Sequence, residues 1–197
     1  MSRIKEFDEE QALNGAMELF WKKGYSATSI DDIVISTGVS RSGLYSSFGD
    51  KKSFFMKALD HYRTKVIHVL MEELFSDSAG LQSIFNHFDM IRNRIGTEEA
   101  KYGCLACNAS IELAFHDVEI SCKATSFVDS IRIAFRRALA RAKSEGEIKE
   151  GANIDSLADH LTNTMLGIAV LSKSALAETM IKNVIDTALA PLKTTIL

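Results

Sequence analysis

The sequence has little that would interrupt a helix. It contains one proline, Pro191, and 11 glycines among 197 residues. Proline and glycine are the residues that most strongly break helices, so such a chain favours long, uninterrupted ones. Hydrophobic residues make up 46 % and charged residues 25 % of the chain, which is ordinary for a globular protein. We therefore expect an all-α fold with a substantial core.

The chain also lacks long apolar runs and a disulfide framework. No stretch of about 18 apolar residues is present, which excludes a transmembrane helix. The N-terminal segment, MSRIKEFDEEQ, has neither the apolar core of a secretion signal nor the character of a transit peptide. The three cysteines are too few for a disulfide scaffold. These absences predict a cytoplasmic, reducing location and no membrane partner.

An excess of positive charge is missing as well. The formal net charge is −3, and residues 1–60 hold eight Lys or Arg and nine Asp or Glu, so their balance is 8 − 9 = −1. Bulk attraction to nucleic acid is therefore weak. A DNA contact would have to come from a local cluster of donors, which a neutral domain can carry.

Signatures of catalysis and of metal binding are also missing. The five histidines are scattered, and none forms H-x-x-x-H or H-E-x-x-H. There is no G-x-S-x-G motif and no glycine-rich phosphate loop. We therefore expect no enzyme, no metal site and no cofactor.

The pattern of the N-terminal quarter indicates three capped helices and the start of a long fourth one. Residues 6–23 form the first, with paired apolar positions every four residues, and Gly24 ends it. Thr28 or Ser29 begins a second, which Thr37-Gly38 breaks. Ser40 caps a third over 41–47, and Asp50 caps a long fourth helix.

The rest of the chain predicts five further helices and one more domain. The patterns indicate helices over 81–95, 98–115, 118–144, from Asn153 or Asp155 to Ser172, and over 175–190, the last stopped by Pro191. No repeat or flexible linker is visible. The likeliest boundary lies within the fourth helix, which gives domains of residues 1–55 and 56–197.

The segment Thr28 to Phe55 carries the strongest functional signal. Two short helices joined by a glycine-containing turn are what a helix-turn-helix requires, and Gly38 can adopt the left-handed conformation at the turn. Small or donor-rich residues at the start of the third helix suit entry into the major groove. Tyr45 and Lys51 offer donors to flanking phosphates. Spacing alone leaves open a small helical bundle that does not bind DNA.

At these positions the sequence resembles the TetR family of repressors. The family pattern appears here as Thr28, Ile30, Ile33, Gly38, Val39, Ser40, Leu44, Tyr45, Phe48 and Lys51. Ser42-Gly43 inverts the commoner order, and Ser47 stands where the family often has histidine, which affects the operator sequence rather than binding. The resemblance implies a ligand-responsive transcriptional repressor that binds double-stranded operator DNA. The predicted DNA-contact residues are Thr28, Ser29, Ser40, Arg41, Ser42, Gly43, Tyr45, Ser46 and Lys51.

The resemblance also implies a homodimer built on the last two long helices. The residues expected at or near the seam are Leu157, Leu161, Met165, Ile168, Leu176, Met180, Val184 and Leu189. An apolar face of this kind suits an intramolecular core equally well.

The stretch Gly103 to Asp117 predicts one wall of an effector pocket. Cys104, Asn108 and Glu112 form a polar row on the predicted helix, beside an apolar row that includes Cys107. Lys101 lies close enough in sequence to lower the pKa of Cys104. We expect a small-molecule or thiol-reactive effector to contact Phe85, Phe88, Cys104, Cys107, Asn108, Glu112, Phe127 and Met165.

The cysteine stretch resembles the NemR-like branch of the family, some members of which sense electrophiles or oxidants through cysteine. Two other interpretations stay open: both thiols are small buried hydrophobes, or they form the pair of a thiol oxidoreductase, although the usual strand-and-helix context is missing. A helical interaction module that has lost DNA binding is a further alternative. Arg41, Tyr45 and Lys51 argue against it, because such a module needs no donors around one short helix.

Overall fold

The structure is a computed structural model that describes residues 7–174 and 177–193. Within these residues every regular element is a helix, which confirms the predicted all-α fold. The elements are α1 (Glu9–Lys23), α2 (Ile30–Thr37), α3 (Arg41–Phe48), α4 (Lys51–Tyr62), a π-helical turn (Arg63–Ile67), α5 (His68–Leu70), α6 (Glu72–Phe75), α7 (Leu81–Arg94), a 3-10 turn (Ala100–Tyr102), α8 (Leu105–Leu113), α9 (Val118–Ser144), α10 (Ile154–Leu171) and α11 (Ala177–Lys193).

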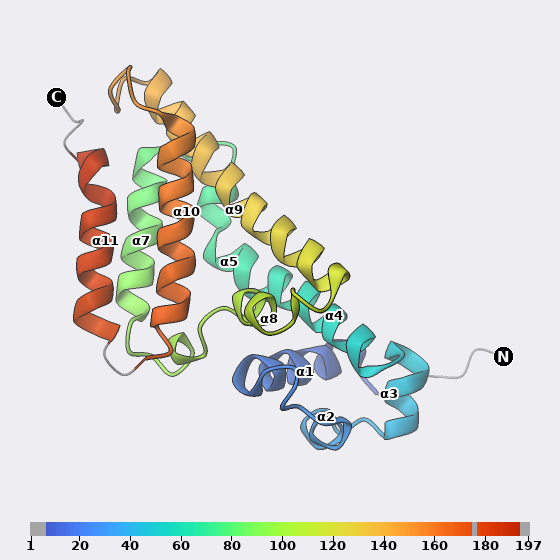
Figure 1. Cartoon of the computed structure of the whole chain (residues 1–197). Coiled ribbons are helices and arrows are strands. Elements are labelled where there is room, and N and C mark those ends of the chain that lie inside the picture. Colours follow the sequence, from blue (N-terminus) through green and yellow to red (C-terminus); the bar gives the residue numbers. More distant parts are fainter. Residues whose placement is uncertain (1–6, 175–176, 194–197) are drawn as a thin grey trace.

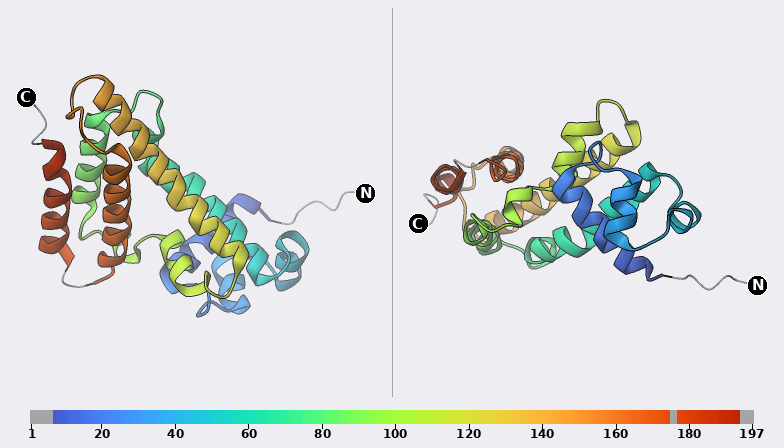
Figure 2. Two further views of the ribbon diagram at one scale, coloured as in Figure 1. Left: turned by 45° about the horizontal axis from the view of Figure 1, so that its top comes forward. Right: turned by 90° about the horizontal axis from the view of Figure 1, so that it is seen from below.

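The helices form two groups that α4 and α9 connect. Figure 1 shows α1, α2 and α3 clustered around the start of α4, while α7, α10 and α11 stand side by side at the other end. The two further views confirm this arrangement, and in both α9 runs from one group toward the other (Figure 2). With 27 residues, α9 is about 40 Å long at about 1.5 Å per residue.

Aromatic side chains fix the N-terminal group to α4. Phe20 of α1 and Phe55 of α4 are both buried, and their rings meet edge to face with centroids 4.9 Å apart. Such a pair contributes about 0.5–1.5 kcal/mol beyond its buried area. Ile33 of α2 and Leu44 of α3 are buried in the same core. The small helices therefore keep their positions relative to α4.

Three helix boundaries differ from the sequence prediction. The predicted helix over 98–115 is a 3-10 turn followed by α8, because Gly103 adopts φ 65° and breaks the path between them. The long fourth helix changes to a π-helical turn at Arg63, and the short helix α6 was missed. Pro191 does not end the last helix, which continues to Lys193. Near a C-terminus proline removes few hydrogen bonds, and the burial of Leu192 holds the last turn in place.

The predicted domain boundary falls within α4, between residues 55 and 56. On the N-terminal side Phe54 and Phe55 pack into the α1–α3 core. On the C-terminal side Tyr62 still contacts the N-terminal group, since its ring lies edge to face with that of Trp21 in α1, with centroids 5.0 Å apart. α4 is therefore shared, and the boundary stays a prediction.

The predicted dimer seam divides into inward and outward residues. Leu161, Ile168 and Leu189 are buried within the chain itself, so they belong to the intramolecular core rather than to an outer face. Leu157, Met165 and Val184 are half-buried, and Met180 is 51 % exposed. Leu176 lies outside the described residues.

Candidate nucleic-acid interface and effector cavity

The turn between α2 and α3 has the predicted geometry. The side chain of Ser29 caps α2 by accepting from the backbone N–H of Asp32, and Asp32 accepts from the N–H of Ser29 in return. Gly38 ends α2 with φ 69° and ψ 5°, the left-handed conformation that glycine adopts without strain. Val39 is buried beneath the turn. The local sequence therefore fixes the angle between the two helices.

The N-terminus of α3 is exposed and polar. Ser40 caps it by accepting from the N–H of Gly43 at 3.2 Å. Gly43 packs closely there, because a Cβ at this position would lie 3.1 Å from both Ser40 Oγ and Val39 Cγ1. Arg41 and Ser42 are exposed, and Arg41 forms an ion pair with Asp31 of α2 at 2.6 Å. An exposed pair of this kind is weak, so the guanidinium can exchange its partner for DNA.

The other predicted DNA contacts fall into two groups. Ser29, Tyr45 and Ser46 are exposed. Thr28 is not: its side chain is 1 % exposed, and its hydroxyl donates to the carbonyl of Gly24 at 2.6 Å. The structure thus removes the Thr28 side chain from the surface, since the hydroxyl is needed to close the turn before α2.

Two lysines flank α3 from α4. Lys51 Nζ lies 4.2 Å from the centroid of the Tyr25 ring, and partial burial lowers the pKa of Lys51. Lys57 was not predicted, yet it is exposed and its ammonium donates to the carbonyl of Ser47 at 3.2 Å. Lys57 lies near the C-terminus of α3, where its ammonium could also contact a DNA phosphate. Its spacing of six residues from Lys51 gave no signal, because residues six apart lie on different faces of a helix.

The predicted effector residues do not form one cavity. Phe88 is fully buried and stacks on Phe135 with centroids 5.9 Å apart, so it is part of the core. Phe85 and Met165 are half-buried and pack on that core. Phe127 does line a cavity, described below, and Cys107 lines a shallow groove between α8, α9 and α10.

Cys104 and Cys107 occupy the first turn of α8. Cys104 is the N-cap residue and is buried, whereas Cys107 is half-buried. A hydrogen bond from the Cys107 thiol lowers the pKa of Cys104 to about 7 in spite of burial, and the same contact raises the pKa of Cys107. Lys101 plays no part, because it pairs with Glu98 at 2.5 Å and is exposed. The predicted effect of Lys101 on Cys104 is therefore wrong.

The polar row on α8 forms hydrogen bonds with other parts of the chain. Asn108 donates to the carbonyl of Tyr102 at 3.0 Å and accepts from Lys173 Nζ at 3.2 Å. The carboxylate of Glu112 accepts from the backbone N–H groups of Tyr25 and Ser26, at 3.0 and 2.6 Å. Both side chains have protein partners in this structure, and their assignment to an effector surface stays a prediction.

Glu112 belongs to a contact between α8 and the loop that follows α1. Burial raises the pKa of Glu112, but the hydrogen bonds from Ser26 and Tyr25 and the charge of Lys51 outweigh it, so the net pKa is lowered. Gly24 makes room for this carboxylate: its φ is 83°, and a Cβ there would lie 3.2 Å from Glu112 Oε2. At the other end of α8, Trp21 Nε1 donates to the carbonyl of Gly103 at 2.9 Å. α8 is thus attached to α1 near its N-terminus and to the loop that follows α1 near its C-terminus.

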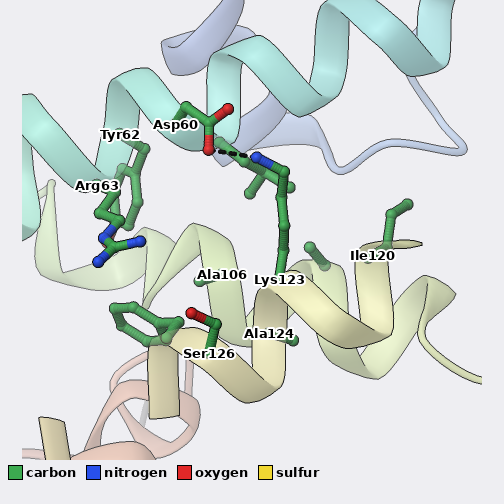
Figure 3. Close-up of a pocket in the computed structure, with 11 residues that line it drawn as sticks. Asp60, Tyr62, Arg63, Ala106, Ile120, Lys123, Ala124 and Ser126 are labelled. Atoms are coloured by element: carbon green, nitrogen blue, oxygen red, sulfur yellow. Dashed lines mark hydrogen bonds and ion pairs between the residues drawn. The ribbon is translucent and has the colours of Figure 1, made fainter. Parts of the chain in front are cut away.

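A small cavity lies between α4, α8 and α9, shown in Figure 3. Its volume is about 80 Å³. Apolar and small side chains make up much of the lining, together with Asp60, Arg63, Lys123 and Ser126. The residues are Leu59, Asp60, Tyr62, Arg63, Ala106, Ala109, Ile120, Lys123, Ala124, Ser126 and Phe127. Of the predicted effector residues, this cavity includes Phe127.

Neither a metal centre nor a membrane span emerges from the part of the chain that is described. Within residues 7–174 and 177–193, no three His, Cys, Asp or Glu side chains gather closely enough to hold a metal ion. No described helix combines the length and the apolar character needed to cross a bilayer.

Comparison with known families identifies similar proteins over both helix groups. The model of the bacterial regulatory proteins of the tetR family matches residues 12–57. The model of the tetracyclin repressor-like C-terminal domain matches residues 80–187, which is more than half of the chain.

Individual relatives extend over almost the whole chain. The uncharacterized HTH-type transcriptional regulator YezE of Bacillus subtilis (strain 168) is 29 % identical over 193 residues, covering 98 % of this chain and 100 % of the relative. The HTH-type transcriptional repressor ComR of Escherichia coli (strain K12) is 28 % identical over 172 residues, covering 87 % and 82 %. A solved structure of the TetR family regulator CifR, a cysteine mutant complexed with 26-base-pair operator DNA, superimposes with a TM-score of 0.84 at 22 % identity, covering 95 % and 98 %.

Proposed function

The chain belongs to the TetR family of bacterial regulatory proteins, and from this premise we propose that it is a dimeric repressor released from its operator by a small molecule. The observation that carries the proposal is the α2–turn–α3 unit, which presents an exposed, capped N-terminus with Arg41 and Ser42 at its surface. Side chains at the start of such a helix reach base edges in the major groove. The relatives are regulators, so the function is binding rather than catalysis.

A dimer is part of this proposal, because one short helix reads too few bases for specificity. Two copies related by a two-fold axis would place two α3 helices in successive major grooves, about 34–36 Å apart. The same proposal includes two further points. The cysteine stretch resembles that of the NemR-like branch, and the protein is located in the cytoplasm. For the cysteines the structure favours a packed environment, since Cys104 is buried.

Arg41 and Lys51 should affect DNA binding in different ways. Arg41→Ala is expected to weaken operator binding by roughly 5–150-fold, because a bidentate base contact contributes about 1–3 kcal/mol, and to relax base preference. Lys51→Ala is expected to weaken binding to all sequences and to reduce the salt slope by about one per subunit. The measurement is a mobility-shift titration at several salt concentrations, using the DNA upstream of the protein's own gene and a scrambled duplex.

Arg132→Ala serves as the control for that experiment. Arg132 pairs with Asp159 between α9 and α10, so Arg132→Ala should leave both affinity and salt slope unchanged. If wild-type protein bound the upstream duplex no better than the scrambled one, the proposal of a repressor acting on its own promoter would be rejected. If Lys51→Ala altered base preference but not salt dependence, then Lys51 would be the base contact and Arg41 the phosphate contact.

We also propose that α8 transmits the effector signal to the DNA-binding helices. The support is the double attachment of α8, through Gly103 to Trp21 and through Glu112 to Tyr25 and Ser26. A movement of α8 then acts on α1 and on the loop that starts α2. Coupling between effector and DNA is reciprocal and typically amounts to about 1–3 kcal/mol.

Glu112→Ala should release the loop between α1 and α2. Hydrogen bonds to a charged group contribute about 1.5–3 kcal/mol when desolvated, and less here because the site is partly exposed. We expect the Tyr25 and Ser26 amides to exchange with solvent about tenfold faster, and operator affinity to fall several-fold. Amide hydrogen exchange followed by NMR or mass spectrometry measures the first effect, and a mobility shift measures the second.

Glu98→Ala is the matched control for Glu112→Ala. Glu98 is also a carboxylate near α8, but its cation partner Lys101 lies on the same exposed turn. It should change neither exchange at Tyr25 nor operator affinity. Unchanged exchange in Glu112→Ala would show that α8 does not restrain this loop.

A further inference from the structure

An exposed cation that pairs with no described residue stands at the edge of the cavity between α4, α8 and α9. Asp60 and Lys123 form an ion pair across one side of it, so their charges cancel. Arg63 extends from the π-helical turn after α4 on another side, and among the described residues none forms a hydrogen bond or an ion pair with its guanidinium. The lining therefore carries one net positive charge, which points to an anionic group in the ligand.

A free hydroxyl lies on the facing helix. Ser126 belongs to α9, and Figure 3 shows Arg63 projecting from α4 toward the part of α9 that carries it. No described residue forms a hydrogen bond with the Ser126 side chain. A planar guanidinium has parallel donors that match the two oxygens of a carboxylate, and a hydroxyl can supply a further donor.

The rest of the lining sets the size and polarity of the ligand. Ala106, Ala109 and Ala124 leave the space open, and Leu59, Ile120 and Phe127 make the remaining walls apolar. A volume of about 80 Å³ is several times the roughly 10–15 Å³ that a cavity needs to hold one water molecule. The ligand is thus a short apolar chain or ring fragment with a single charged end.

Arg63 also occupies an informative position on its helix. It is the first residue of the π-helical turn Arg63–Ile67, which follows directly on α4. Turns of this kind inside helices occur frequently at functional sites. A ligand held between Arg63 and α9 would act on the helix whose N-terminal part packs against α1 through Phe55.

We propose that this cavity binds the carboxylate of a small, otherwise apolar acid, with Arg63 as its bidentate partner and Ser126 as an additional donor. The proposal rests on the proposed function, for which this acid is the effector. Binding of the acid to the isolated protein can be measured without DNA, so the ligand proposal and the proposed function can fail independently.

The test is calorimetric titration of the full-length protein with butyrate and with its neutral isostere butyramide. We expect butyrate to bind wild-type protein and to bind Arg63→Gln at least about tenfold more weakly, since a charge-assisted hydrogen bond contributes about 1.5–3 kcal/mol. Arg63→Lys should fall between the two, because it keeps the charge and loses the paired donors. Butyramide should bind wild-type protein at least tenfold more weakly than butyrate.

Arg136→Gln is the matched control, because Arg136 lies on α9 and pairs with Asp155 outside the cavity. It should bind butyrate as wild type does. Equal binding of butyrate and butyramide, equal binding to wild type and Arg63→Gln, or no binding of butyrate would each overturn the proposal. Inorganic phosphate binding as tightly as butyrate would also overturn it, by showing a general anion site. Butyrate binding without operator recognition would reject the proposed function and leave this site intact.

Discussion

Met180→Arg should convert the protein to a monomer and reduce its affinity for a two-half-site operator by at least about 100-fold. Linking two binding modules through a dimer raises overall affinity by roughly 10²–10⁴-fold over one module. A variant that cannot pair keeps an intact α3 but loses that gain. This is the largest effect on DNA binding that we expect from any single substitution outside the DNA-binding helices.

The choice of Met180 follows from its exposure. It lies on α11 and is 51 % exposed, so its side chain contributes little to the core of its own chain. Around it a shallow groove runs between α10 and α11, lined by His160, Thr164, Thr179, Met180, Asn183, Val184, Thr187 and Ala188. In a symmetric dimer the two introduced arginines would carry like charges into a surface that loses water on pairing. Such a juxtaposition costs several kcal/mol.

The oligomeric state is measured by sedimentation or light scattering, and operator binding by mobility shift. Val69→Arg is the control: Val69 is 65 % exposed on α5, so it tests an added charge at another exposed apolar position. It should remain a dimer with wild-type affinity. A Met180→Arg protein that stays dimeric and binds the operator normally would place the interface elsewhere.

Local signals explain why the DNA-binding helices could be predicted so closely. The caps Ser29, Ser40 and Asp50 and the left-handed Gly38 each act within four residues of their own position. Such short-range hydrogen bonds and backbone preferences are written directly in the sequence. The boundaries of α2, α3 and the start of α4 therefore needed no tertiary information.

The functions of residues on α8 could not be predicted in the same way. Glu112 was placed in a pocket because of its spacing from Cys104, but its partners are 86 and 87 residues away in the sequence. The cavity was missed for a similar reason, since it requires α4 and α9 to lie side by side. Periodicity shows which residues share a helix face, and it does not show what that face meets.

Gly103→Ala should lower the free energy of unfolding by about 2–6 kcal/mol. Gly103 has φ 65° and ψ −141°, a conformation that residues with a Cβ adopt only at a cost of about 1–3 kcal/mol. A Cβ there would also lie 2.5 Å from the backbone carbonyl oxygen of Ala169 in α10, which cannot move without distorting that helix. Overpacking of this kind costs about a further 1–3 kcal/mol.

The single tryptophan reports on the same site. Trp21 is the one tryptophan in the sequence, and its Nε1 donates to the carbonyl of Gly103 at 2.9 Å. Displacing Gly103 should expose the indole and shift its fluorescence emission to longer wavelength. Because this bond attaches α8 to α1, operator affinity should fall together with stability.

Gly146→Ala separates the steric clash from the backbone effect. Gly146 also has positive φ, 77°, but a Cβ there would meet nothing within 4 Å. Gly146→Ala should lower the free energy of unfolding by about 1–2 kcal/mol, which is the cost of the left-handed backbone conformation alone. It should leave Trp21 fluorescence unchanged. Chemical denaturation followed through CD and fluorescence measures both variants. Equal destabilisation by the two substitutions would mean that α8 can move away from α10 without cost, and such a helix could not transmit an effector signal by being held at both ends.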